Sequence, residues 1–236
     1  MADVAASVLA RLKSKAAKSG RSYQLCLQLF CQEEFLRRLE KSKYAENFVL
    51  KGGLFIYSLT DFDSRVTADV DFLLRKIPNT PEQLKAVLEE IVSTETGNDF
   101  ITFEIKSVAP IAIAKKYAGI GASIVAKIKN TKTPFGIDIG VGDIIVPRQE
   151  KRRIPTQLDG FDAPTVNTYS LETTIAEKID AILSLKSIDL QPAPCRIFQF
   201  FCTFRQFFRH PFPLLFNFHI FPAHLRFPHP SSVFFL

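Results

Sequence analysis

The composition of the chain changes abruptly near residue 190, and this break decides which part can form an ordinary globular domain. Residues 1–190 contain 26 basic and 24 acidic side chains, a net charge of +2. Residues 191–236 contain four Arg, no Lys and no acid, together with 13 of the 23 Phe, all four His and seven of the 14 Pro. Most of the formal charge of +6 therefore comes from the tail and does not by itself indicate a nucleic-acid-binding protein.

The first 190 residues are long enough and apolar enough to bury a core as one domain. The chain has no charge-free apolar run of the length needed to span a bilayer, and its N-terminus lacks the apolar core of a signal peptide. We therefore expect a cytoplasmic protein that does not associate with a membrane.

Hydrophobic periodicity predicts helices first, then strands mixed with helices, and then a final helix. Helical spacing covers residues 4–18, 23–41, 81–93 and 170–185, and strand patterns cover residues 69–74, 101–105, 123–128 and 136–141. On the second helix, the charged residues Arg37, Arg38, Glu40 and Lys41 are predicted to face solvent. Residues 148–167, rich in charged and turn-forming side chains, are predicted to be a loop. The pattern indicates an α+β domain.

Three carboxylates on two of the predicted strands are the strongest chemical signal. Asp69 and Asp71 lie two residues apart, so their side chains point to one face of a strand. Asp138 lies between Ile137 and Ile139, where a carboxylate is costly unless it is paired or bound to a metal. Such a set can hold one or two Mg²⁺, which prefer oxygen ligands and leave room for substrate phosphates. The alternative for the Asp-x-Asp pair is a structural turn or a solvated strand face.

Gly52 and Gly53, which precede a predicted helix, add a second signal. Backbone N–H groups at a helix N-terminus, unobstructed by side chains, can bind phosphate oxygens. A Gly-Gly pair alone is more often a plain turn. The order of a Gly-Gly turn, a helix, an Asp-x-Asp strand and a later strand carrying Asp138 is, however, the layout of a nucleotidyltransferase palm domain.

Five segments resemble, in order and spacing, the AbiEii/AbiGii-type nucleotidyltransferase toxins of bacteria. These segments are LRRLEKSKYAENF, FVLKGGLFIYSL, RVTADVDFLL, FGIDIGVGDIIVP and YSLETTIAEKIDAIL. The resemblance implies an α+β fold with a polymerase-β-like nucleotidyltransferase core, N-terminal helices and a truncated helical C-terminal part. We expect an N-terminal helical segment at 1–45, the nucleotidyltransferase core at 46–150, a helical part at 151–190 and an atypical tail rich in Phe, Pro and His at 191–236.

The resemblance also implies catalytic roles. Asp69 and Asp71 would bind Mg²⁺. Asp138 would be the third carboxylate of the metal site and the base for the attacking hydroxyl.

The nucleotide-binding roles are implied in the same way. Gly52 and Gly53 would hold the triphosphate of an NTP, and Lys178 would face its phosphates. Arg65 would either contact a phosphate or pair with an acid.

By resemblance, the protein would be the Mg²⁺-dependent nucleotidyltransferase toxin of a type IV-like toxin–antitoxin system that acts in abortive infection. It would transfer a nucleotide from an NTP to a tRNA or another RNA acceptor and bind a cognate antitoxin protein. Two departures favour a catalytically inactive or truncated nucleotidyltransferase-fold binding protein as the alternative. Leu54 stands where many nucleotidyltransferases carry Ser or Thr, and the Asp expected after the helix of Lys178 is absent.

The composition of the tail indicates a change of reading frame. Regrouping the codons of residues 194–198 by one base allows Met-Gln-Asp-Phe, close to the Lys-Asp-Phe step of the family, so we expect a frameshift near residues 188–193. The nucleotide sequence tests this, because a shifted frame without a family-like helix before a stop would refute it. The alternatives are a genuine aromatic-rich segment that binds a partner or a membrane surface, and a metal site. The residues of that metal site would be His210, His219, His224 and His229.

Overall fold

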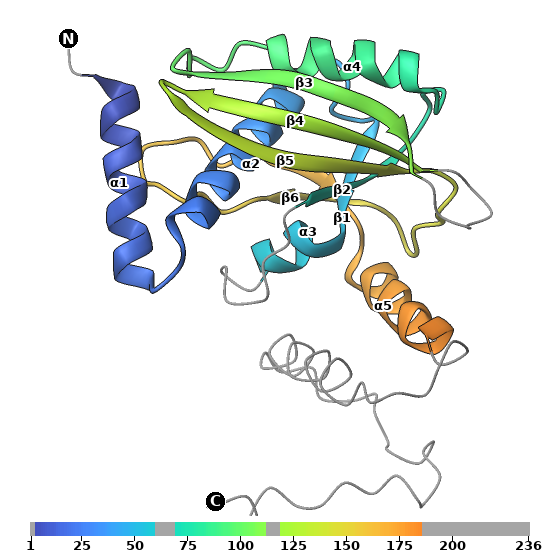
Figure 1. The fold of residues 1–236 in the computed structure, drawn as a ribbon. Helices are drawn as coiled ribbons and strands as arrows, with labels where there is room; N and C mark the ends of the chain where they lie inside the picture. Colours follow the sequence, from blue (N-terminus) through green and yellow to red (C-terminus); the bar gives the residue numbers. More distant parts are fainter. Residues whose placement is uncertain (1–2, 60–68, 112–118, 186–236) are drawn as a thin grey trace, which may run out of the picture. The chain divides into compact units, whose positions relative to one another are not determined.

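The structure, a computed structural model, describes residues 3–59, 69–111 and 119–185 (Figure 1). The chain divides into two compact units, Met1–Pro192 and Ala193–Leu236, and the described residues all belong to the first. The predicted frameshift junction, the tail at 191–236 and Arg65 lie outside the described residues. The segment boundaries expected at residues 45 and 150 stay predictions.

A seven-stranded mixed sheet forms the centre of the first unit, with the strand order β3-β4-β5-β2-β1-β7-β6. The strands are β1 (Phe48–Lys51), β2 (Asp69–Leu74), β3 (Ile101–Pro110), β4 (Ile120–Ile128), β5 (Thr131–Gly140), β6 (Glu150–Arg153) and β7 (Thr165–Thr168). β2 runs parallel to β5, and β1 runs parallel to β7. The other neighbouring strands are antiparallel.

Five helices accompany the sheet in the described part of the chain, and together they confirm the predicted α+β class. They are α1 (Val4–Ser19), α2 (Tyr23–Lys41), α3 (Gly52–Leu59), α4 (Pro81–Ser93) and α5 (Leu171–Leu185). Side-chain oxygens of Asp3, Ser22 and Thr80 cap the starts of α1, α2 and α4 by accepting backbone N–H groups. None of these helices combines the length and apolar character needed to cross a membrane.

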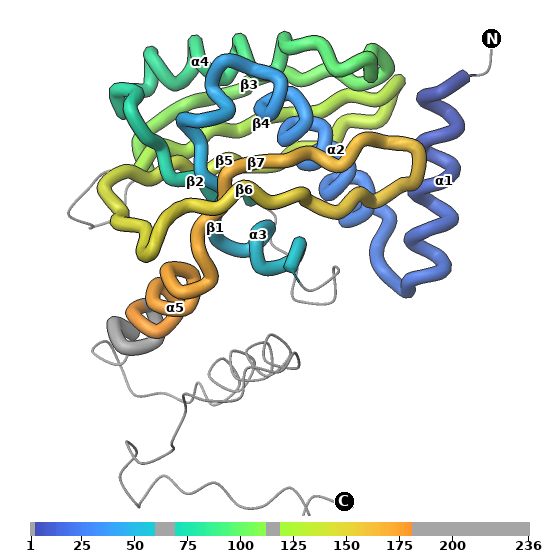
Figure 2. Tube along the Cα trace, turned by 180° about the vertical axis from the view of Figure 1, so that it is seen from behind, coloured from blue at the N-terminus to red at the C-terminus, as the bar shows by residue number. Residues whose placement is uncertain are grey.

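The core is built around α2, which packs against the sheet through aromatic contacts. The Phe35 ring lies 6.2 Å from that of Phe72 on β2 and 6.4 Å from that of Phe135 on β5. α1 and α4 pack against other sides of α2 (Figures 1 and 2). Phe161, from the loop between β6 and β7, contacts the ring of Phe30. Because the sheet, both helices and this loop surround it, α2 is buried over most of its length.

The prediction that Arg37 and Arg38 face solvent is wrong, whereas Glu40 and Lys41 are exposed as predicted. Arg37 is 3% exposed and Arg38 is 9% exposed. The Nε of Arg37 donates to the Asp162 carbonyl at 2.6 Å, and an Nη of Arg38 donates to the Ile101 carbonyl at 2.8 Å. These carbonyls come from distant parts of the chain, so the local periodicity of the helix could not reveal the burial of the two arginines.

The prediction of a continuous loop at 148–167 is also wrong, because this stretch contains β6 and the start of β7. Each strand has only four residues. β7 is held by parallel pairing with β1, which lies more than a hundred residues earlier in the chain. The two strands, EKRR and TVNT, contain one apolar residue between them, so no hydrophobic alternation marks them as strands in the sequence.

Candidate functional site

Three charged residues of the central strands share one face of the sheet. In the register of the sheet, Lys51 on β1 lies opposite Asp71 on β2, and Asp71 lies opposite Asp138 on β5. Residues directly opposite one another on neighbouring strands project to the same face. The next residue of β2, Phe72, points to the other face, where it packs on Phe35 of α2. The charged side chains therefore lie on the face of the sheet that is turned away from α2.

Asp69 belongs to the same face, because it lies two residues before Asp71 on β2. Its partner on β5 is Gly136. A Cβ atom added to Gly136 would lie 2.4 Å from the Oδ1 of Asp69, so the carboxylate occupies the space above this glycine. We refer to Lys51, Gly52, Gly53, Asp69, Asp71 and Asp138 together as the sheet-face site.

The Gly52–Gly53 turn is fitted closely to the second carboxylate of the Asp-x-Asp pair. β1 ends at Lys51 and α3 begins at Gly52, whose φ of +64° lies in the left-handed region. A Cβ atom on Gly52 would lie 2.1 Å from the Oδ2 of Asp71. The backbone N–H of Gly53 donates to this same oxygen at 3.3 Å. The structure thus brings Gly52, Gly53 and Asp71 together, and here the Gly53 N–H binds a carboxylate.

The negative charge of the site is only partly balanced by protein groups. Burial raises the pKa of the Asp71 carboxyl, although the Gly53 hydrogen bond acts in the opposite direction. Burial also raises the pKa of Asp138, and repulsion from Asp69 adds to the rise. No hydrogen bond or ion pair reaches the Asp138 carboxylate from the residues that the structure describes. Carboxylates with raised pKa values that face one another are typical of sites that bind cations or move protons.

Four residues at the edge of this site form one connected group, and its central lysine is not indicated by any motif of the sequence. The Nζ of Lys51 donates to Asp143 Oδ2 at 2.7 Å and to Glu177 Oε1 at 2.9 Å. The Tyr169 hydroxyl also donates to Asp143 Oδ2, at 2.6 Å, and Lys51 Nζ lies 5.3 Å from the centre of its ring. The position of Lys51 directly before Gly52 was the one available signal.

Of the two remaining predicted residues, Lys178 and Arg65, only Lys178 lies in the described part of the chain. Lys178, half-buried on α5, lies near enough to Asp71 for its positive charge to oppose the raised pKa of that carboxyl. Arg65 falls outside the described residues, so its predicted contact with a phosphate or an acid stays a prediction.

The donor chemistry of the site fits a divalent cation that arrives with a phosphate ligand. In the parts of the chain that are described, no group of three or more His, Cys, Asp or Glu side chains is arranged so that it could hold a metal ion. Mg²⁺ does not require such a group, because it is commonly bound by one or two carboxylates together with substrate phosphates and water. The raised pKa values of Asp71 and Asp138 indicate that a cation would be favourable here.

Two solved structures resemble the chain over a part of its length. One is a proposed nucleotidyltransferase from H. pylori, with 18% identity, a TM-score of 0.37 and coverage of 64% of this chain and 57% of that chain. The other is JHP933 from Helicobacter pylori, with 18% identity, a TM-score of 0.37 and coverage of 63% of this chain and 55% of that chain. The chain thus spans little more than half the length of either protein. No curated protein matches it.

The comparison with protein families is more specific. The sequence model of the family described as "Nucleotidyl transferase AbiEii toxin, Type IV TA system" matches residues 34–194. This range is more than half of the chain and includes every residue of the sheet-face site, as well as Asp143, Tyr169 and Glu177. The protein with this carboxylate-bearing sheet therefore belongs to the AbiEii nucleotidyl transferase toxin family of type IV toxin–antitoxin systems.

Proposed function

We propose that the chain transfers a nucleotidyl group from an NTP to a hydroxyl of an RNA acceptor, with tRNA as the first acceptor to test. The observation that carries the proposal is the placement of Asp69, Asp71 and Asp138 on one face of neighbouring strands, beside the Gly52–Gly53 turn. In this reaction the acceptor oxygen forms a bond to the α-phosphorus, the bond from that phosphorus to the bridging oxygen breaks, and pyrophosphate leaves.

The carboxylates take separate roles in the proposal. Asp69 and Asp71 hold Mg²⁺, which, when bound, balances the charge of the triphosphate and polarises the α-phosphate. Asp138 accepts the proton of the attacking hydroxyl. The raised pKa of Asp138 suits this role, because a carboxylate that binds protons more tightly than usual is a stronger base.

The remaining predicted residues would bind the nucleotide. Gly52 and Gly53 present a turn without side chains to the triphosphate, and Lys178 contributes a positive charge from α5. Arg65 contacts a phosphate or pairs with an acid.

Family membership also supports a biological setting for the reaction. We propose that the protein acts in the cytoplasm as the toxin of a pair, that a cognate antitoxin protein encoded with it restrains it, and that the pair serves in abortive infection. The family description names a type IV toxin–antitoxin system, which is the support for this part of the proposal.

A catalytically inactive binding protein is the second candidate, and one observation favours it. Leu54 follows the two glycines and is 5% exposed within the hydrophobic core. A side chain in that position does not offer a hydroxyl to a phosphate. The absence of the family's Lys-Asp-Phe step after α5, where the last acid of the chain is Asp189, points in the same direction. On this view the fold and nucleotide binding are retained and the chemistry is lost.

Incubation of the full chain with each labelled NTP, Mg²⁺ and total tRNA tests the two candidates. We expect label on RNA with the unaltered protein and none with Asp69→Ala or Asp71→Ala. The matched control is Asp159→Asn, an exposed acid in the loop between β6 and β7, which should retain transfer. Transfer by both alanine variants would contradict the proposed mechanism. If the unaltered protein binds NTP but transfers no label, the catalytically inactive binding protein is favoured.

A further inference from the structure

Lys51 is the residue of the sheet-face site that contacts α5. It is the last residue of β1, pairs with Asp71 in the β1–β2 ladder and directly precedes Gly52. Its side chain is 18% exposed, and its ammonium group donates to both Asp143 and Glu177. Lys51 thus connects the end of β1 with the loop after β5 and with α5.

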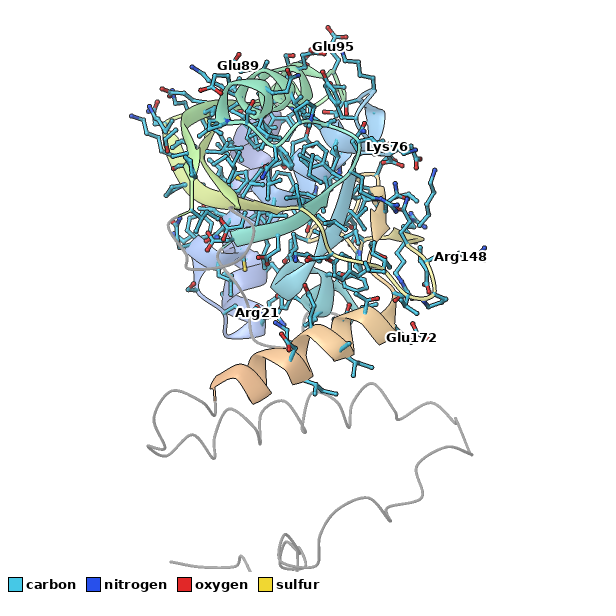
Figure 3. All side chains as sticks on the ribbon, turned by 90° about the vertical axis from the view of Figure 1, so that its right-hand side faces the viewer. Arg21, Lys76, Glu89, Glu95, Arg148 and Glu172 are labelled. Atoms are coloured by element: carbon cyan, nitrogen blue, oxygen red, sulfur yellow. The ribbon has the colours of Figure 1, made fainter. Side chains whose placement is uncertain are left out.

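Among the residues that the structure describes, α5 has few polar contacts with other elements. At its start, Thr173 accepts the backbone N–H of Val146 at 2.8 Å, and Ser170 caps the helix by accepting the N–H of Thr173. Beyond this first turn, the described side chains of α5 make one hydrogen-bonded ion pair with other elements, from Glu177 to Lys51. Figure 3 shows α5 passing beneath α3, with Glu172 in its first turn.

We propose that Lys51 is a positioning residue that holds α5 beside the sheet-face site through Glu177, and so keeps the neighbouring Lys178 near the nucleotide phosphates. The inference rests on the proposed nucleotidyl transfer, in which Lys178 binds phosphate. Asp143 and Tyr169 fix the ammonium group of Lys51 from the other side.

The surroundings of Lys51 favour this role over direct contact with a phosphate. Two of its three N–H groups donate to carboxylates, and the ring of Tyr169 lies beside the ammonium group. Burial lowers the pKa of Lys51, but Asp143 and Glu177 outweigh burial and raise it above its usual value. The charge of Lys51 is thus matched by two protein acids, and a phosphate would have to compete with both of them for this lysine.

A double-mutant cycle on Lys51 and Glu177 tests the inference, with KM for the NTP and kcat measured separately. Lys51→Met and Glu177→Gln should each raise KM roughly ten- to a hundredfold, as expected for the loss of one charged hydrogen bond. The double variant should be no worse than either single variant, because both changes break the same link. Lys51→Arg, which keeps donors for both acids, should stay close to the unaltered protein.

The matched control is Lys43→Met, which breaks an exposed ion pair between Lys43, just after α2, and Glu90 of α4 and should leave KM unchanged. Direct contact between Lys51 and a phosphate would raise KM in Lys51→Met and leave it unchanged in Glu177→Gln, and that result would overturn the positioning role. Because Glu177 is 35% exposed, its variant keeps the test decisive even where Lys51→Met does not fold.

Amide hydrogen exchange of α5 separates this inference from the proposed function. Without any nucleotide, both Lys51→Met and Glu177→Gln should speed exchange in the part of α5 beyond Thr174, and Lys43→Met should not. Unchanged exchange in both variants would overturn the positioning role. Absence of transfer by the unaltered protein would overturn the proposed function alone, since the exchange measurement does not depend on activity.

Discussion

The protein holds two groups of clustered charges, one buried and one partly exposed, and they are built in opposite ways. One is the helix cluster, formed by Glu33, Glu34, Arg37 and Arg38 of α2. The other is the sheet-face site. In the helix cluster each acid has an arginine partner within one turn of the same helix. In the sheet-face site acids face one another, and Asp138 has no ion-pair partner among the described residues.

The hydrogen bonds of the helix cluster show how completely it is satisfied. Glu34 accepts from Arg37 at 3.2 Å and from Arg38 at 3.3 Å, and also from Thr96 and from Asn98. These partners lie on α2 and on the segment after α4. Glu34 therefore ties the central helix to its surroundings, and nothing in this arrangement requires a ligand.

The two groups represent two uses of clustered charge. A matched, hydrogen-bonded cluster keeps a helix in place, and breaking one partner leaves an unpaired charge in the interior. An unmatched cluster of acids costs stability in the free protein and becomes favourable when a cation or proton is bound. Mutations in the helix cluster should therefore lower the stability of the protein, whereas mutations in the sheet-face site should lower its activity.

The largest effect is expected for Asp138→Asn. Loss of the proposed base should lower kcat by roughly two to four orders of magnitude. The free energy of unfolding should stay the same or rise, because the substitution removes repulsion from Asp69. Transfer kinetics and urea unfolding measure the two quantities, with Asp159→Asn as the control. A variant that loses stability and keeps its activity would show that Asp138 belongs with the structural charges.

The next effect is expected for Glu34→Ala, which should lower the free energy of unfolding by about 3–5 kcal/mol, because both arginines keep their buried charge and lose an acid. Glu40→Ala on the exposed side of the same helix should change it by less than about 0.5 kcal/mol. Urea unfolding measures both variants. Equal stabilities for the two would contradict a stabilising role for the helix cluster.

A smaller effect, on activity, is expected for Gly136→Ala. The added methyl group would meet the Asp69 carboxylate at 2.4 Å and displace it, which should lower kcat by up to ~100-fold, the size expected for a misplaced catalytic group. Stability should change little, because the end of one side chain moves. The control is Gly140→Ala, where the nearest atoms lie 3.9 and 4.0 Å away. If the two variants had the same kcat, the placement of Asp69 would not matter.

The sequence was sufficient to predict that the three carboxylates share one face of the sheet, but it was not sufficient to predict the contacts of Lys51. Asp69, Asp71 and Asp138 lie on strands with clear alternation, and register pairing alone brings their side chains to one face. Gly136, two residues before Asp138, is a further signal in the sequence, since a glycine there leaves room for the Asp69 carboxylate on the neighbouring strand. The contacts of Lys51 depend on the loop after β5 and on the docking of α5, which no local pattern encodes.

The burial of Arg37 and Arg38 could not be predicted for a related reason. Charges at Arg37 and Arg38 have the spacing of a solvated face, and the acids one turn earlier also fit an exposed, paired helix surface. Their burial follows from packing by α4, the start of β3 and the loop between β6 and β7. A helix surrounded on all sides is recognisable only once these long-range partners are known.

The last prediction uses Glu33 to test the helix cluster by pH. Burial raises the pKa of Glu33 from 4.5 to about 8, although Arg37 and the N–H of Gln157 hold it down. The native state therefore binds this proton more tightly than the unfolded chain does. Stability from this group is fully present below about pH 4.5 and is lost as the pH rises towards 8.

Between these values the free energy of unfolding should fall with pH by at most about 1.4 kcal/mol per pH unit. The measurement is urea unfolding at a series of pH values, for the unaltered protein and for Glu33→Gln. Gln cannot titrate, so the difference between the two curves isolates the contribution of Glu33 from that of every other group. Parallel curves would mean that Arg37 keeps Glu33 ionised throughout. In that case the helix cluster would be a fully charged set of ion pairs, and its contrast with the proton-binding acids of the sheet-face site would be sharper still.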